Sequence, residues 1–288
     1  MKPSRSLFID VRGLRYHCRT WGSEGAPRLF LLHGWMDCSA SFQFLVDELR
    51  GDRCVIAPDW RGFGLTQWSG ADTYWYQDYL ADLDVILRHF QPDAPVDIVG
   101  HSLGGNVAAH YAGTRPERIR KLVNLEGFGL ANTELRDAPV RYSRWLDEIS
   151  TDARFKDYGS FDALAERLRR DNPRIGSERA QFLARHWGRQ EPSGRVVLQM
   201  DPAHRRTNPA RFRRDEAMAV WRNIEAPVLW VSGEHSENFA RHRITPEDYA
   251  ARKDCFRNRT ESTLADAGHM LHHDRPELLA SLIEEFLG

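Results

Sequence analysis

Short apolar runs and amphipathic helical patterns alternate along most of the chain. The apolar runs, rich in β-branched residues, predict strands at 28–32, 54–57, 96–99, 119–125, 227–232 and 262–265. Helical periodicity predicts helices at 39–49, 74–90, 103–113, 246–255 and 276–287, with Ser39 or Ser41 as N-cap of the first. Before them, apolar and polar residues alternate around 11–14, which predicts a hairpin. Repeated β–α units favour the α/β class, with a mostly parallel central sheet flanked by helices on both faces.

The alternation stops between residues 128 and 222, where the pattern is helical and loop-like. We interpret this segment as a helical cap inserted between two strands, so that 1–127 and 223–288 form the core domain and 128–222 the cap. Its aromatic side chains either line a pocket for an apolar or aromatic group or pack the cap onto the core. These side chains are Trp145, Phe155, Phe161, Phe182, Trp187, Phe212 and Trp221. Trp35 and Trp60, which come after strands, are the better pocket candidates.

The stretch 96–105, V-D-I-V-G-H-S-L-G-G, combines a strand, a sharp turn and the start of a helix. Ser102 lies between Gly100 and Gly104 in the pattern G-x-S-x-G. Such a turn lifts one side chain out of the sheet, and glycines permit the close backbone approach that it needs. A serine held there can act as a nucleophile, but the short pattern also arises by chance, so its partners decide the matter.

Reactive side chains follow the other predicted strands as well. Ligands of an open α/β sheet bind beyond the carboxyl ends of its strands, so residues in these places are expected to converge. They lie in the segments 33–35, 59–64, 126, 233–237 and 268–269.

Four segments, in this order, resemble motifs of the α/β-hydrolase superfamily, of the serine-nucleophile or esterase type. They are H-G-W at 33–35, D-W-R-G-F-G at 59–64, G-H-S-L-G-G at 100–105 and D-A-G-H at 266–269, and the resemblance covers nearly the whole chain. It implies Ser102 as nucleophile, His269 as general base, a carboxylate that orients the histidine, and a cap over the site. The backbone N–H groups of Leu103 and Trp35 are expected to form the oxyanion hole. A serine at this sharp turn, called the nucleophile elbow in the superfamily, argues against haloalkane dehalogenases and epoxide hydrolases, which have an aspartate there.

The acid of this triad is not where most of the superfamily has it. An aspartate usually follows the penultimate strand in the pattern G-x-x-D, and here that position is Ser236. Three carboxylates are alternatives: Glu126, Glu237 and Glu234. We favour Glu126, because some relatives place a glutamate after the strand that precedes the cap and because its apolar surroundings suggest a buried carboxylate that needs a partner.

Other polar residues near these segments have simpler interpretations. His33 is expected to orient the loop before Trp35, and His101 to pack and bond locally. Asp59 and Arg61 are expected to pin loops by charge-assisted hydrogen bonds. His272 and His273 are interpreted as rim residues.

Composition narrows the class of protein. The chain has 288 residues, of which 41% are hydrophobic and 28% charged, with a formal net charge of -1, so no global field favours nucleic acid or an anionic membrane. No apolar run is long enough to span a bilayer, and the N-terminus lacks the apolar core of a signal peptide. Four scattered cysteines suggest free buried thiols in a reducing cytoplasm. Arginine far outnumbers lysine, as a GC-rich bacterial genome would produce.

The function favoured by these observations is a cytoplasmic serine hydrolase that cleaves a small ester, thioester or related carbonyl compound. We expect no cofactor, no metal, and no partner other than the small-molecule substrate, in a monomer or homodimer. A carbon–carbon bond hydrolase with the same triad is an alternative, because the sequence does not separate the two reactions. A small-molecule receptor without turnover, on the same fold, is another.

Overall fold

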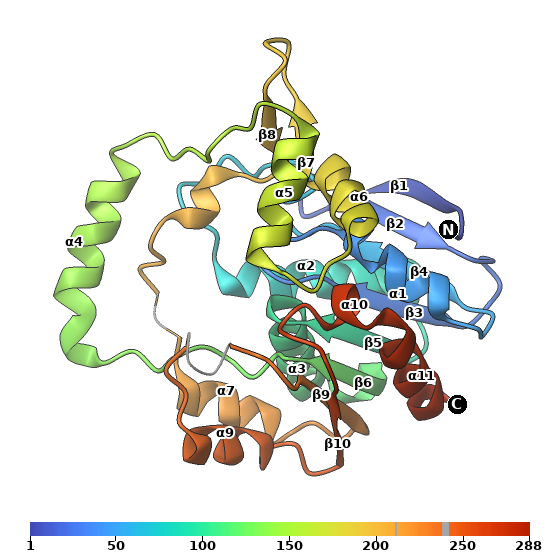
Figure 1. Cartoon of the computed structure of the whole chain (residues 1–288). Helices are drawn as coiled ribbons and strands as arrows, with labels where there is room; N and C mark the ends of the chain where they lie inside the picture. The colour runs from blue at the N-terminus through green and yellow to red at the C-terminus, as the bar shows by residue number, and fades with distance from the viewer. Residues whose placement is uncertain (211, 238–241) are drawn as a thin grey trace.

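The computed structural model describes residues 1–210, 212–237 and 242–288. Within this part of the chain, an eight-stranded sheet has the order β1-β2-β4-β3-β5-β6-β9-β10 (Figure 1). Its strands are β1 (Ser4–Val11), β2 (Leu14–Trp21), β3 (Arg28–Leu32), β4 (Cys54–Pro58), β5 (Val96–His101), β6 (Ile119–Leu125), β9 (Val228–Gly233) and β10 (Arg259–Leu264). β1 and β2 form the predicted hairpin, β2 pairs antiparallel with β4, and all neighbours from β4 to β10 are parallel. The mostly parallel sheet predicted from the sequence is confirmed.

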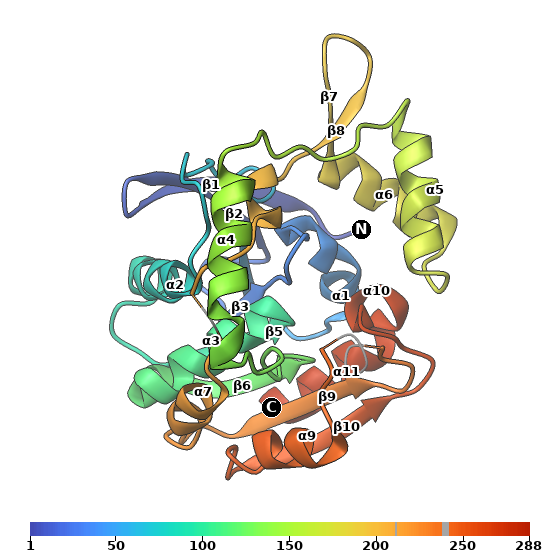
Figure 2. The ribbon, with the colours of Figure 1, turned by 90° about the vertical axis from the view of Figure 1, so that its left-hand side faces the viewer.

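Helices cover both faces of the sheet, as the two views at right angles show (Figures 1 and 2). They are α1 (Gln43–Glu48), α2 (Tyr76–Phe90), α3 (Leu103–Thr114), α4 (Ala138–Ile149), α5 (Phe161–Asp171), α6 (Ser177–Trp187), α7 (Arg214–Trp221), α9 (Pro246–Lys253), α10 (Leu271–Asp274) and α11 (Pro276–Leu287). Successive side chains of a strand point to opposite faces of the sheet, so the apolar side chains form two layers, one on each face. Leu29 and Leu31 of β3 pack with α1 and α11, whereas Phe30 and Leu32 pack with α2 and α3.

Two local predictions are wrong. Neither Ser39 nor Ser41 is the N-cap: the first turn, η1 (Ser39–Phe42), has Cys38 as its N-cap, and the Ser41 hydroxyl donates to the side chain of Asp37 instead. The segment between β6 and β9 is also not purely helical. It contains a small antiparallel hairpin of β7 (Gly188–Gln190) and β8 (Val196–Leu198), too short for its alternation to stand out in the sequence.

The inserted segment is held by its aromatic side chains. Trp221 is buried, and five of the others are partly buried and packed against the core: Phe155, Phe161, Phe182, Trp187 and Phe212. The second interpretation given above, that these residues pack the insertion onto the core, therefore describes most of them. α7 packs directly on α3. The contact is so close that a Cβ on Gly113 would lie 2.0 Å from the carbonyl oxygen of Val220.

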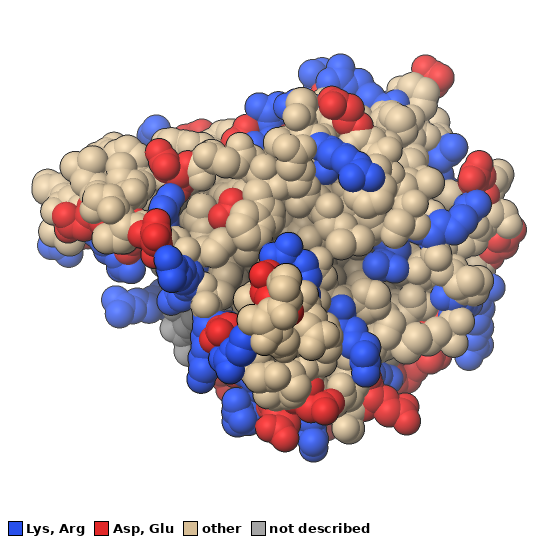
Figure 3. All heavy atoms as spheres, turned by 90° about the horizontal axis from the view of Figure 1, so that it is seen from above, with Lys and Arg blue, Asp and Glu red and all other residues tan. Residues whose placement is uncertain are grey.

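The surface and the cysteines agree with the composition. Basic and acidic side chains are interspersed on the face seen from above, and the lobe formed by α4 projects from it (Figure 3). Cys18, Cys38, Cys54 and Cys255 are all buried and free, as predicted. No helix in the described part of the chain combines the length and apolar character needed to cross a bilayer.

Candidate active site

Ser102 stands at the sharp turn between β5 and α3. Its backbone has φ +51° and ψ -112°, a left-handed conformation that is strained for a residue with a Cβ. The turn is held by two backbone bonds: Ser102 N–H donates to Leu125 O at 2.8 Å, and Ser102 O accepts from Asn106 N–H at 2.9 Å. A Cβ on Gly104 would lie 2.1 Å from the carbonyl oxygen of Leu32, so only glycine permits α3 to approach the sheet this closely.

The loop after β3 passes directly over Ser102. A Cβ on Gly34 would lie 3.3 Å from the Cβ of Ser102. The next residue, Trp35, is 54% exposed, which agrees with its role as a pocket candidate, whereas Trp60 is fully buried and the corresponding prediction for it is wrong. Trp60 turns inward because its indole N–H donates to His33 O at 2.9 Å. Trp35 and Leu103, the two candidate oxyanion-hole residues, thus follow Gly34 and Ser102 on adjoining segments.

The structure brings Glu126 and His269 together. Glu126 Oε2 lies 3.1 Å from Nδ1 of His269, which comes from the loop after β10. Glu126 is almost fully buried at the end of β6, where its backbone has φ +59°. Its Oε1 accepts from Gly233 N–H at 2.9 Å, and its Oε2 accepts from the Ser236 hydroxyl. These partners compensate for the lost hydration of the buried carboxylate. The carboxylate can therefore hold one tautomer of the His269 imidazole.

The two alternative acids lie elsewhere. Glu234 is exposed, and its carboxylate accepts from Asp266 N–H at 3.0 Å. Glu237 is an exposed loop residue. Of the three carboxylates considered from the sequence, all of which belong to the described residues, Glu126 is in contact with His269.

A buried histidine cluster lies behind His269. His101 Nε2–H donates to the backbone carbonyl of His269 at 2.8 Å, and burial, which disfavours the charged ring, lowers the pKa of His101 well below its usual value. His101 therefore supports the segment that carries His269, over a longer range than the local packing predicted. His272 and His273 are not rim residues as predicted: both are buried, because the short helix α10 turns them toward Phe42 and Phe44.

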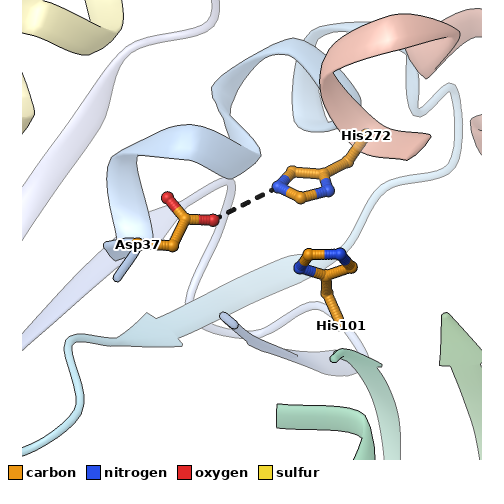
Figure 4. Close-up of side chains that lie close together, drawn as sticks. All are labelled: Asp37, His101 and His272. Carbon is orange, nitrogen blue, oxygen red and sulfur yellow. Dashed lines mark ion pairs between the residues drawn. The ribbon is translucent and has the colours of Figure 1, made fainter. Parts of the chain in front are cut away.

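Asp37 closes this cluster (Figure 4). It lies 3.4 Å from His272 Nε2 and accepts from Cys38 N–H, the Ser41 hydroxyl and the indole N–H of Trp187 at the end of α6. Burial acts to raise the pKa of Asp37, but the hydrogen bond from His272 and the nearby imidazoles outweigh it and hold this pKa well below its usual range. The cluster thus connects the loop after β3, the insertion and α10.

Asp37, His101 and His272 are also residue types that bind transition metals, and their ligand atoms lie within 4.8 Å of one another. Both oxygens of Asp37 already accept protein donors in this arrangement. A second group, Glu234, His235 and Asp266, is exposed.

His33, Asp59 and Arg61 have structural positions. His33 Nε2 accepts from Trp60 N–H, so the proton is on Nδ1, which donates to Gly34 O; this orients the loop as predicted. Asp59 contacts His17 at 2.7 Å. Burial acts to raise the pKa of Asp59, but the bond from His17 and other donors lower it to about 2. Arg61 binds Asp82 through two nitrogens, each at 2.6 Å. Both residues pin loops, with partners that the sequence did not indicate.

The sequence did not identify two polar residues of the site. Asp37 stands two residues after H-G-W, but nothing in its neighbourhood marks it as buried. Ser236 was noted only as the place of an absent aspartate, whereas its hydroxyl donates to Glu126.

Comparison with known proteins agrees with this architecture. The family model of the alpha/beta hydrolase fold matches residues 27–276. A serine hydrolase-like protein of Danio rerio is 26% identical, over 93% of this chain and 84% of the relative. Serine hydrolase-like protein 2 of Homo sapiens is 24% identical, over 93% of this chain and 89% of the relative.

Among solved structures, a thioesterase domain from the curacin biosynthetic pathway superposes with a TM-score of 0.88. It is 26% identical, and the match covers 98% of this chain and 99% of that one. These relatives support a hydrolase on this fold. The family model matches most of the chain, the sheet is mostly parallel, and Ser102 stands at a strained turn. The chain therefore belongs to the alpha/beta hydrolase fold family.

Proposed function

We propose that the protein is a serine hydrolase of small esters, thioesters or related carbonyl compounds, with Ser102, His269 and Glu126 as its triad. The observation that carries the proposal is the contact of Glu126 Oε2 with His269 Nδ1 at 3.1 Å, on the same sheet edge as the strained turn of Ser102. Likeness to a thioesterase domain favours thioesters within this class.

In the proposed mechanism, Ser102 Oγ attacks the carbonyl carbon and His269 Nε2 takes the hydroxyl proton. Glu126 stabilises the resulting imidazolium and keeps the Nδ1 proton on its own side of the ring. The N–H groups of Leu103 and Trp35 donate to the oxyanion; in comparable sites one such donor is worth about 3 to 4 kcal/mol of transition-state stabilisation. His269 then protonates the leaving alcohol or thiol, and water, deprotonated by the same ring, releases the acyl group.

Within this proposal, residues 128–222 act as the cap that delimits the substrate. The buried free cysteines fit a reducing compartment, which supports our proposal of a cytoplasmic location. The partner that the mechanism requires is the small-molecule substrate.

Labelling with a fluorophosphonate probe tests the proposal. Wild-type protein is expected to be labelled and Ser102→Ala is not, whereas Ser150→Ala, which removes an exposed serine hydroxyl on the insertion, is labelled as wild type. Folded wild-type protein that remains unlabelled would overturn the proposal and favour a receptor. Turnover of p-nitrophenyl esters and acyl thioesters of increasing chain length then defines the acyl group, and cleavage of a diketone without ester turnover would favour the carbon–carbon hydrolase.

A further inference from the structure

Glu126 is held by a loop to which it does not belong. It follows β6, but both of its carboxylate oxygens accept hydrogen bonds from the end of β9 and the residues after it. Gly233 N–H donates to Oε1 at 2.9 Å, and the Ser236 hydroxyl donates to Oε2. Oε2 is also the oxygen that faces His269 Nδ1. The Ser236 hydroxyl and the histidine therefore converge on one atom.

Ser236 occupies the position at which most members of the superfamily have their aspartate. An aspartate at 236 would place its carboxyl carbon where the serine hydroxyl oxygen now lies, since both atoms are bonded to Cβ. Its oxygens would then extend toward the point held by Glu126 Oε2. The ends of β6 and β9 are neighbours in the sheet, with Leu125 opposite Val231, so both positions reach the same side of His269.

We propose that Ser236 is a positioning residue for Glu126, and that its hydroxyl lies at a point beside His269 that a longer side chain at 236 would also reach. In this chain the glutamate provides the charge, and the serine hydroxyl fixes the lone pair of Oε2 that faces His269. A hydrogen bond to a carboxylate also stabilises its charged form. Because it spreads part of the negative charge that faces the imidazole, it lowers the basicity of His269. The inference rests on the proposed triad.

The placement of residue 236 beside His269 is tested by moving the carboxylate from 126 to 236. We expect Glu126→Ala to lower kcat for an ester substrate by about a thousandfold or more, as loss of a triad acid does elsewhere. The double variant Glu126→Ala/Ser236→Asp should recover at least about tenfold of this loss, equivalent to one charge-assisted hydrogen bond. The matched control is Glu126→Ala/Ser236→Asn, which has the same shape without the charge and should recover nothing.

The outcomes separate the inference from the proposed function. If Glu126→Ala is as active as wild type, the triad assignment itself fails. If Glu126→Ala is impaired and the Asp and Asn double variants are equally inactive, while both keep the circular dichroism spectrum and melting temperature of the single variant, the placement of residue 236 beside His269 is overturned and the triad stands.

The positioning role has its own readout. Ser236→Ala should lower kcat by about tenfold with KM unchanged, because one hydrogen bond to the acid is lost. The acidic limb of its pH–rate profile should move to higher pH, since the freed negative charge on Oε2 holds the proton of His269 more tightly. Ser236→Thr, which keeps the hydroxyl, should restore both values. An unshifted acidic limb in Ser236→Ala would contradict the role, because a merely structural residue would leave that limb in place.

Discussion

The two halves of the insertion are attached to the core in different ways. α5 and α6 bury Leu164, Leu168 and Leu183 in the same apolar cluster as side chains of the core, whereas none of the residues of α4, all of which the structure describes, is buried. Three large apolar side chains of α4 are exposed: Val140, Tyr142 and Leu146.

Polar contacts tether α4 instead. The indole N–H of Trp145 donates to the Thr73 hydroxyl at 2.9 Å, and Arg141 Nε donates to Pro209 O at 3.1 Å. Burial of apolar surface contributes more to stability than a few partly solvated hydrogen bonds, and weakly packed segments open at lower free energy. We therefore expect the α5–α6 half to unfold together with the core, and α4 to open at a lower free energy without unfolding the core.

The largest expected difference is in core packing. Leu183→Ala in α6 should lower the free energy of unfolding by about 2 to 5 kcal/mol, because it leaves a cavity at a fully buried position. Leu146→Ala in α4, where the side chain is 55% exposed, should change it by less than about 0.5 kcal/mol. Urea denaturation followed by circular dichroism measures both. Equal losses would show that the two halves are packed alike.

A pH-dependent anchor gives the second test. His204, in the turn η4 (Pro202–Arg205) where the insertion returns to the core, is stacked between Phe63 and Tyr74 at centroid distances of 3.8 and 3.7 Å. Burial lowers the pKa of His204 to about 3. Between pH 6.5 and 3 the unfolded chain binds this proton and the folded chain does not, so stability falls as pH falls through that window, by up to about 1.4 kcal/mol per pH unit.

His204→Phe should keep the stacking and remove this share of the acid sensitivity. The free energy of unfolding, measured in urea at pH 7 and pH 5, should therefore differ less in the variant than in wild type. His89→Phe, at an exposed position, is the control and should keep the wild-type difference. If both variants retain it, the anchor does not respond to acid.

The smallest effect concerns α4 alone. Its backbone amides should exchange with deuterium faster than those of α5, because its opening does not require the core to open. Trp145→Phe should accelerate exchange in α4 by about fivefold to tenfold, the equivalent of one hydrogen bond, without changing α5. Mass spectrometry of proteolytic peptides resolves the two helices. Acceleration in both would mean that the halves open together.

The sequence predicted the fold and the convergence of the site better than it predicted the environment of single side chains. Strand runs, helical periodicity and the elbow at Ser102 are local signals, and parallel topology then places the strand ends at one edge. That logic made Glu126, Glu234 and Glu237 candidates, and the resemblance to relatives with a glutamate before the cap favoured Glu126, which the structure brings to His269. It did not predict that His272 and His273 are buried, or that Trp60 turns inward. Those outcomes depend on packing between segments far apart in the chain, for which a single sequence carries no periodic signal.

The four buried cysteines offer a way to follow opening of the core independently of α4. All of them, at positions 18, 38, 54 and 255, lie outside residues 128–222, and burial raises the pKa of each thiol. Only the thiolate reacts rapidly with alkylating reagents, so the native thiols are shielded by both access and charge. The rate of alkylation would therefore measure how often the core opens, and opening of α4 alone would not change this rate.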